Sequence, residues 1–213
     1  MTIQTLADTV AKPVKVRRTQ AERTEETRRR LLDAAVDVLA TKGYAGFRTA
    51  DVAAIAGVSR GAQTHHFPSK DELVMAVVEH VFQRAAEAGR KRARRVGSVD
   101  DAIKELISDS QDFFFSELFL IAVDLAIQGR MRASEENPVS DISAASRLPV
   151  EASWLAALIE SGVPPSVAED LLWLTISIVR GLAVRRLWQN DTQRFSRLFK
   201  LWRKMVVLYL ETL

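Results

Sequence analysis

The residues best suited to chemistry lie between Arg60 and His66, where small and polar side chains follow one another without an apolar interruption. An arginine such as Arg60 can donate two hydrogen bonds to guanine, and a glutamine such as Gln63 can pair with adenine. Thr64 and His66 can contact phosphate oxygens, and the small residues after Arg60 allow a backbone to approach a duplex closely. These residue types favour recognition of a nucleic acid over the making or breaking of bonds.

The residues before this segment provide the elements that would position it. Thr49 is a candidate N-cap for a short helix that Gly57 ends, because glycine enters the left-handed conformation without cost. Val58 supplies one apolar residue in the turn, and Ser59 can cap a second short helix. Two short helices joined by such a turn predict a helix-turn-helix, whose second helix enters the major groove of DNA.

The charge distribution agrees with this interpretation. Residues 1–95 hold 18 Lys and Arg against 11 Asp and Glu, whereas residues 96–213 hold 12 against 16, so a total of +3 hides two parts of opposite sign. Basic residues are densest from Lys12 to Arg30 and include Arg17 and Arg18. We expect a flexible basic arm over residues 1–22, which either contacts phosphates or serves as a solvated tail.

Composition excludes several other classes of function. The chain has no cysteine and three histidines. The adjacent His65 and His66 would point about 100° apart on a helix and could not both bind one metal ion. We therefore expect neither a metal nor a cofactor. The longest apolar runs have six residues, where a membrane-spanning helix needs about 20. A cytoplasmic protein with no secretory signal and no membrane contact is the expectation.

An enzyme with an appended DNA-binding module is the competing class. Its chemistry would need clustered carboxylates or a nucleophile with a base. The nearest acidic clusters, Asp109–Asp112 and Glu135-Glu136, have no histidine close in sequence and are typical of solvated helix faces. We therefore expect no catalytic residues.

Helical periodicity recurs along the whole chain, which predicts an all-α fold. A first helix is expected from a Thr24 cap to Gly43, and Ser69 with Glu72 forms a capping-box pattern that begins a helix reaching about Arg95. Further helices are expected near 98–115, 117–131, 140–160, 166–188 and 192–212. We divide the chain into the arm, a three-helix DNA-binding domain over 23–72, and an effector-binding and dimerisation domain over 73–213.

The stretch Ala34–Leu73, which includes GYAGFRTADVAAIAGVSRGAQTHHFPSKDEL, closely resembles the DNA-binding region of the TetR/AcrR family of transcriptional regulators. The resemblance covers roughly residues 25–80. It implies a homodimer that binds a palindromic DNA operator through its helix-turn-helix and carries a variable C-terminal effector domain. Members of the family mostly repress promoters and release DNA when a small molecule binds. An architectural DNA-binding protein without an inducer is the remaining alternative.

The family pattern implies a phosphate contact for Thr49, base reading for Arg60 and Gly61, and a backbone contact for Lys70. Where the family usually has Thr-Leu-Tyr, this chain has Ala62, Gln63 and Thr64. The phosphate contact at position 64 is therefore shorter or absent, and Gln63 is either a base reader or a polar rim residue. The full set of DNA-binding candidates is Arg17, Arg18, Arg48, Thr49, Ser59, Arg60, Gly61, Ala62, Gln63, Thr64, His65, His66 and Lys70.

The last two helices are apolar on nearly all sides, so each must be buried on two faces. A small domain has one core, and the second face therefore predicts a symmetric four-helix interface between two subunits through 166–188 and 192–212. The alternative is burial of both helices within one subunit.

Aromatic and soft apolar side chains also gather in the part of the chain where the family binds ligands. They suggest a pocket for a hydrophobic or aromatic effector, although each can equally be ordinary core. The ligand-binding candidates are Phe113, Phe115, Phe119, Asp124, Met131, Trp154 and Trp173.

Overall fold

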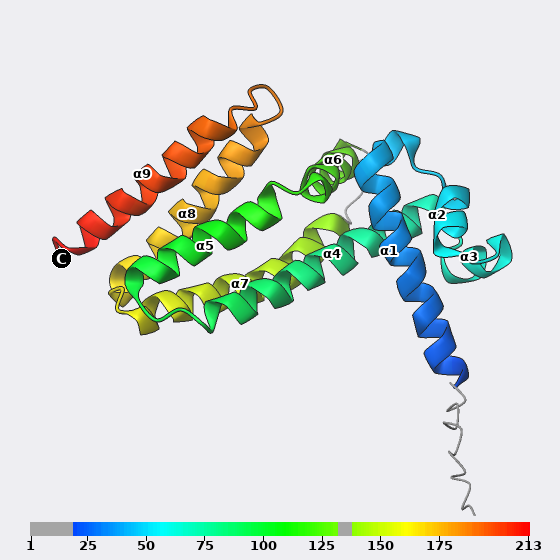
Figure 1. The fold of residues 1–213 in the computed structure, drawn as a ribbon, viewed down its shortest axis with the longest axis horizontal. Helices are drawn as coiled ribbons and strands as arrows, with labels where there is room; N and C mark the ends of the chain where they lie inside the picture. The colour runs from blue at the N-terminus through cyan, green and yellow to red at the C-terminus, as the bar shows by residue number, and fades with distance from the viewer. Residues whose placement is uncertain (1–18, 132–137) are drawn as a thin grey trace, which may run out of the picture.

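A computed structural model describes residues 19–131 and 138–213, and in those two ranges the fold is entirely helical (Figure 1). The expected all-α class is confirmed. The helices are α1 Gln20–Gly46, α2 Thr49–Ala56, α3 Arg60–His66, α4 Lys70–Ala93, α5 Val99–Phe114, α6 Glu117–Met131, α7 Pro138–Ser161, α8 Pro165–Arg185 and α9 Thr192–Leu210. None of these helices is both long enough and apolar enough to span a bilayer.

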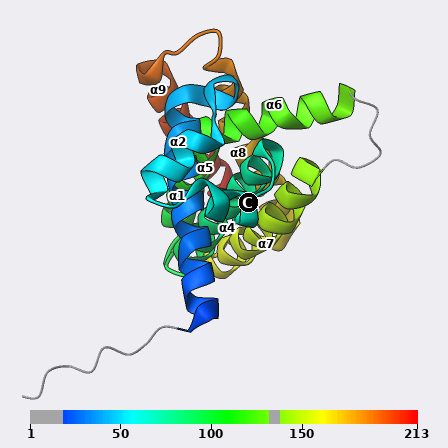
Figure 2. The same ribbon diagram turned by 90° about the vertical axis from the view of Figure 1, so that its right-hand side faces the viewer.

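Two hydrophobic cores stabilise the molecule, and α4 contributes to both. The first core joins α1, α2 and the beginning of α4, with Leu31, Val52 and Leu73 fully buried. The second joins the rest of α4 to α5–α9 around the fully buried Trp154. In Figure 1, α1–α3 lie at one end of the molecule and α8 and α9 at the other, while α4 runs between them beside α7. The end-on view shows that α6 projects sideways from this bundle (Figure 2).

The start of α1 differs from the expectation. Thr19, not Thr24, caps the helix: Thr19 Oγ1 accepts a hydrogen bond from the Glu22 amide at 3.2 Å, and Glu22 Oε2 accepts one from the Thr19 amide at 2.7 Å. Thr24 lies inside the helix and donates to the Gln20 carbonyl. This reciprocal capping box satisfies two backbone donors at once, whereas Thr24 has no glutamate three residues later. The segment expected to be an arm is therefore helical from residue 20 onward.

Glycine at Gly57 is required for the sharp turn between α2 and α3. Its backbone has a φ of 63° and a ψ of 39°, in the left-handed region. A Cβ there would lie 2.9 Å from Arg30 Nη2, and Arg30 Nη2 donates to the carbonyls of both Ala56 and Gly57. The arginine thereby fixes the turn onto α1, which sets the direction of α3.

The remaining local predictions are mostly confirmed. Ser59 caps α3 by accepting from the Ala62 amide at 3.1 Å, and Ser69 caps α4 by accepting from the Glu72 amide at 3.1 Å. The expectation for α2 was wrong, because its N-cap is Arg48, without a side-chain hydrogen bond, and Thr49 is the first helical residue. Gly43 breaks the regular geometry of α1 with a φ of 62°, but a further turn continues to Gly46.

Candidate nucleic-acid interface and effector cavity

The outer face of α3 presents Arg60, Gly61, Thr64 and His65 to solvent. Within the two described ranges, no hydrogen bond or ion pair engages the Arg60 guanidinium, and its five donors are therefore available to a partner. The Thr64 hydroxyl donates to the Arg60 carbonyl at 3.0 Å, so its proton is already used in a hydrogen bond within α3. This face is suited to close approach of a polar, negatively charged surface.

Gln63 does not belong to this face. Its side chain is only 3% exposed, and its Nε2 donates to the Phe67 carbonyl at 2.8 Å. Positions 63 and 67 are four residues apart, so both face the core that α3 shares with α1, α2 and the start of α4. The sequence left Gln63 as either a base reader or a polar rim residue, and its burial contradicts both: its amide satisfies the carbonyl at the end of α3.

The candidates around α3 are positioned by neighbouring helices. Lys70 is half-buried at the start of α4, where its Nζ donates to the Tyr44 carbonyl at 2.7 Å and lies 4.1 Å from the centre of the Tyr44 ring. Tyr44 in turn donates from its hydroxyl to Asp71 Oδ1 at 2.6 Å. These contacts hold the Lys70 ammonium beside the α1–α2 turn, with donors left for a phosphate.

The other DNA-binding candidates fall into two groups. Arg48 and Ser59 are exposed, whereas Thr49, Ala62 and His66 are partly covered. Arg17 and Arg18 lie outside the described residues. Among the residues that are described, no three histidine or carboxylate groups gather closely enough to hold a metal ion.

A cavity of about 510 Å³ lies where α4, α6, α7 and α8 meet. This size falls in the range of small-molecule sites, and the walls are mainly apolar. The lining residues are Phe82, Phe119, Ala122, Val123, Ala126, Ile127, Val139, Ser143, Ala144, Arg147, Leu148, Glu151 and Arg180.

A buried polar cluster adjoins this cavity. Arg147 of the cavity wall is 6% exposed, and its Nη2 lies 3.9 Å from Oδ2 of the buried Asp109, which also accepts a hydrogen bond from Trp154 Nε1 at 3.0 Å. Burial raises the pKa of Asp109, and the Arg147 charge and the Trp154 hydrogen bond offset only part of that effect. Gly89 of α4 makes room for the carboxylate, since a Cβ there would lie 2.8 Å from Asp109 Oδ1.

Comparison with known proteins agrees with the helix-turn-helix geometry. The family model described as bacterial regulatory proteins, tetR family, matches residues 31–77, which run from the middle of α1 through α2 and α3 to the first turns of α4. The HTH-type transcriptional regulator CymR of Pseudomonas putida is 45% identical over 181 residues, which cover 85% of this chain and 89% of that protein. The chain belongs to the tetR family of bacterial regulatory proteins.

Solved structures of other proteins share the fold. A TetR-family transcriptional regulator from Cytophaga hutchinsonii superposes with a TM-score of 0.65 at 13% identity, over 87% of this chain and 95% of that one. The multidrug binding protein EbrR, complexed with proflavin, superposes with a TM-score of 0.53 at 24% identity, over 86% and 99% of the two chains. At these identities the likeness concerns the fold alone.

Family membership decides between the classes left open by the sequence. The chain is a helix-turn-helix transcriptional regulator and not an enzyme. Regulators of the tetR family bind DNA and small-molecule effectors and function as dimers. The alternative of a DNA-processing enzyme is therefore set aside.

Few of the ligand-binding candidates lie in the cavity wall of this tetR-family chain. Phe119 lines the cavity, and Phe113 packs behind it with ring centres 5.7 Å apart. Phe115 instead packs against Phe195 and Phe199 of α9, which places it on another face of the second core.

Three further ligand-binding candidates also lie elsewhere. Trp154 is fully buried behind Asp109, Trp173 is 60% exposed on the outer face of α8, and Asp124 is exposed on α6. The side chain of Met131 lies outside the described residues. The cavity wall instead contains Arg147 and Glu151, which the sequence analysis did not name as candidates.

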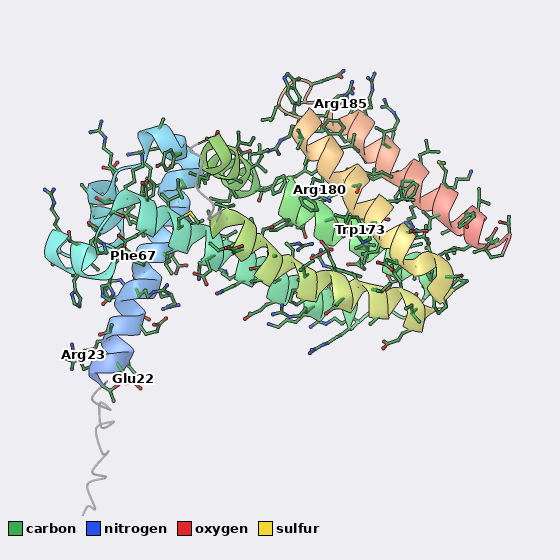
Figure 3. All side chains as sticks on the ribbon, turned by 180° about the vertical axis from the view of Figure 1, so that it is seen from behind. Glu22, Arg23, Phe67, Trp173, Arg180 and Arg185 are labelled. Carbon is green, nitrogen blue, oxygen red and sulfur yellow. The ribbon has the colours of Figure 1, made fainter. Side chains whose placement is uncertain are left out.

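A broad apolar surface on α8 and α9 completes the arrangement. The inner faces of both helices pack into the second core, as Leu172 and Val206 show. The outer faces leave large apolar side chains exposed (Figure 3 labels Trp173 on α8). Together with two exposed residues of the connection that follows α8, Leu187 and Trp188, they are Trp173, Leu174, Leu198, Leu201, Met205, Leu208 and Tyr209. We call this set the α8–α9 apolar face; its exposure shows that one subunit does not bury both helices.

Proposed function

We propose that this regulator is a cytoplasmic homodimeric repressor that binds a palindromic operator through α3 and releases it when a small apolar or aromatic effector occupies the cavity. The observation that carries the proposal is the exposed Arg60 guanidinium on the outer face of α3, which none of the described residues engages. Arg60 and Gly61 would lie against base edges, while Thr49 and Lys70 would contact phosphates.

The proposed division of the chain follows from the two cores. A basic arm over 1–22 and the DNA-binding domain over 23–72 would act together on DNA, although α1 already begins at Gln20. Residues 73–213 would form the effector-binding and dimerisation domain. Because α4 contributes Leu73 to the first core and Phe82 to the second, a rearrangement around the cavity can be transmitted to α3 through this helix.

Dimerisation through α8 and α9 is supported by the α8–α9 apolar face. Monomeric proteins rarely expose contiguous apolar surfaces larger than a few hundred Å². Two copies of the face related by a two-fold axis would form a four-helix interface. The two α3 helices would then lie about 34–36 Å apart, or a multiple of it, to enter successive major grooves.

Selection of bound fragments from a random DNA pool, followed by footprinting, tests this function. We expect one enriched sequence that contains two inverted half-sites. In the footprint, the centres of the two half-sites should lie one helical turn apart, or a whole number of turns, so that both are protected on the same side of the duplex. The Lys104→Ala variant, which loses an exposed positive charge on α5, should select the same sequence. Recovery of fragments with no common sequence would contradict the proposal and favour an architectural role.

A further inference from the structure

A second cavity, of about 540 Å³, lies in the groove between α4 and α7. These two helices run beside each other along the bundle (Figure 1). The groove has no lining residue in common with the proposed effector cavity: Ser143 and Arg147 of α7 line that cavity, whereas Asp141 and Ala145 line the groove. A ligand in this α4–α7 groove would therefore leave the proposed effector cavity free.

The lining of the α4–α7 groove carries more negative than positive charge. Glu79 and Glu87 of α4 and Asp141 of α7 supply three carboxylates, and Arg90 of α4 supplies one guanidinium. Glu79 accepts a hydrogen bond from Gln83 Nε2 at 3.0 Å. Within the two described ranges, neither Glu87 nor Asp141 forms an ion pair with a cation. The groove therefore attracts positively charged molecules.

A buried hydroxyl in the same lining lacks a partner. Ser146 is only 7% exposed, yet its hydroxyl forms no hydrogen bond with any residue that the structure describes. In the same helix, Ser153 donates to the Pro149 carbonyl four residues earlier at 2.9 Å, as serine often does inside a helix. Because buried hydroxyls normally have a hydrogen-bond partner, Ser146 offers an unused donor and acceptor to a molecule in the groove.

Apolar side chains lie among the charged groups of the groove. Ala86 of α4 faces the groove together with Ile142 and Ala145 of α7. Glu79 and Glu87 are eight residues apart, which is about 12 Å along the axis of α4. Among the described residues, no three carboxylate or histidine groups gather closely enough to hold a metal ion, so the negative charge is spread along the groove. This pattern fits an extended organic cation better than a compact metal ion.

We propose that the α4–α7 groove binds a linear aliphatic polyamine. Each ammonium group has only donors, which match the oxygens of the three carboxylates and of the Ser146 hydroxyl. The methylene chain between the ammonium groups lies against Ala86 and Ala145. This inference goes beyond the proposed function, because the groove contains none of the residues assigned to DNA contact or to the effector cavity.

Matched compounds test the charge and the chain of the ligand. The probes are spermidine, cadaverine, pentylamine and pentanediol, each added to the full chain without DNA in a thermal-denaturation assay at about 0.15 M salt, where long-range attraction is screened. Spermidine or cadaverine should raise the melting temperature in a saturable way, pentylamine should bind more weakly, and pentanediol should have no effect. No rise with either polyamine, or an equal rise with magnesium chloride, would overturn the proposal.

Charge-removing variants of the groove test the carboxylates. The double variant Glu87→Gln with Asp141→Asn changes two exposed side chains, and its dissociation constant for the stabilising polyamine should rise by about 5- to 10-fold. The matched control Glu160→Gln alters an exposed carboxylate of α7 outside the groove and should bind like the wild type. Equal dissociation constants for the double variant and the wild type would contradict the assignment.

Ser146→Ala tests the buried hydroxyl. Because that hydroxyl has no partner among the described residues, the variant without ligand should be at least as stable as the wild type, while its affinity for the polyamine should fall several-fold. A less stable variant with an unchanged dissociation constant would show that the hydroxyl serves the fold and not a ligand.

Arg90→Gln tests the sign of the charge that the groove accepts. Removal of this guanidinium should strengthen polyamine binding several-fold, whereas Arg94→Gln, an exposed residue of the same helix end outside the groove, should have little effect. Weaker binding by Arg90→Gln would contradict a cation site. None of these measurements involves DNA, so their failure would leave the proposed repressor function in place, and failure of operator binding would leave the polyamine site in place.

Discussion

The side-chain amide of Gln63 donates a 2.8 Å hydrogen bond to the carbonyl of Phe67, inside the DNA-binding end rather than on its surface. The bond satisfies the end of α3, a helix of seven residues that begins with the exposed Arg60. Under the proposed function, base recognition would therefore fall to the exposed residues that flank Gln63, while Gln63 itself stabilises the end of α3.

Replacement of Gln63 by alanine should lower the free energy of unfolding without changing the preferred DNA sequence. Loss of the buried hydrogen bond and of side-chain packing should cost about 1–3 kcal/mol. Urea denaturation measures the stability, and selection from a random DNA pool measures the preference. A change of preferred base at one operator position, with stability unaltered, would show that Gln63 reads DNA after all.

Gly57→Ala should abolish operator binding because it disturbs the turn that orients α3. Alanine is strained at a φ of 63°, and its Cβ would crowd Arg30 Nη2 at 2.9 Å, so we expect a loss of stability above about 1 kcal/mol. Denaturation and operator binding are measured on the same preparations.

Gly61→Ala is the matched control on α3. A Cβ at Gly61 meets only Ser59 Oγ at 4.0 Å, so stability should rise by about 0.5–1 kcal/mol, as for glycine replacement within a helix. Operator affinity should nevertheless fall, because the added methyl group keeps the α3 backbone away from the bases. A stable Gly61→Ala chain with undiminished affinity would exclude close approach at this residue.

Leu201→Glu should convert the dimer to a monomer and, because a monomer binds only one half-site, should also reduce operator affinity. Leu201 is 52% exposed on the α8–α9 apolar face, where a carboxylate buried against a second copy would lack a partner. Sedimentation at micromolar concentration measures the mass. The control Ile55→Glu places the same charge on an exposed apolar residue of α2 and should remain dimeric. A monomeric wild-type chain would refute the interface outright.

The ion pair between Asp100 and Arg203 predicts a pH dependence. Arg203 Nε donates to Asp100 Oδ1 at 2.6 Å, joining α5 to α9, and this hydrogen bond lowers the pKa of Asp100. A lowered pKa in the folded state means that the contribution to stability is present above the unfolded pKa, near 3.9, and is lost as the pH falls through the folded value.

Because this ion pair is exposed to solvent, Asp100→Asn should cost less than about 1 kcal/mol at pH 7. The difference in unfolding free energy from the wild type should shrink as the pH falls below about 4, where the unfolded carboxylate becomes protonated. Urea denaturation at several pH values checks this, and a difference that grows on acidification would contradict the sign.

Local signals in the sequence predicted most helix boundaries. Gly57, Ser59 and Ser69 act within one turn of the chain, so their roles do not depend on the rest of the fold. The same kind of signal was available for α1, since Thr19 and Glu22 have the spacing of a capping box that Thr24 lacks. The general form of the DNA-binding end followed from these short-range rules and from the family resemblance.

The cavity could not be predicted in the same way, because it depends on how four helices meet. Trp154 and Trp173 are both large aromatic residues on helices, yet one is fully buried and the other 60% exposed. Periodicity shows that α7 and α8 have apolar faces but does not show which neighbour covers each face. Arg147 acquires its significance only from Asp109 on α5, 38 residues earlier in the chain.

The most direct test of the DNA-recognition account is the affinity of the wild type and of Arg60→Ala for the selected operator and for random DNA at one fixed salt concentration. We predict that the wild type binds the operator at least about 10³-fold more tightly than random DNA. Arg60→Ala should lose about 1–3 kcal/mol on the operator and relax specificity at one base, with random-DNA binding little changed. Equal loss on both DNAs, or no loss on the operator, would contradict recognition of bases by α3.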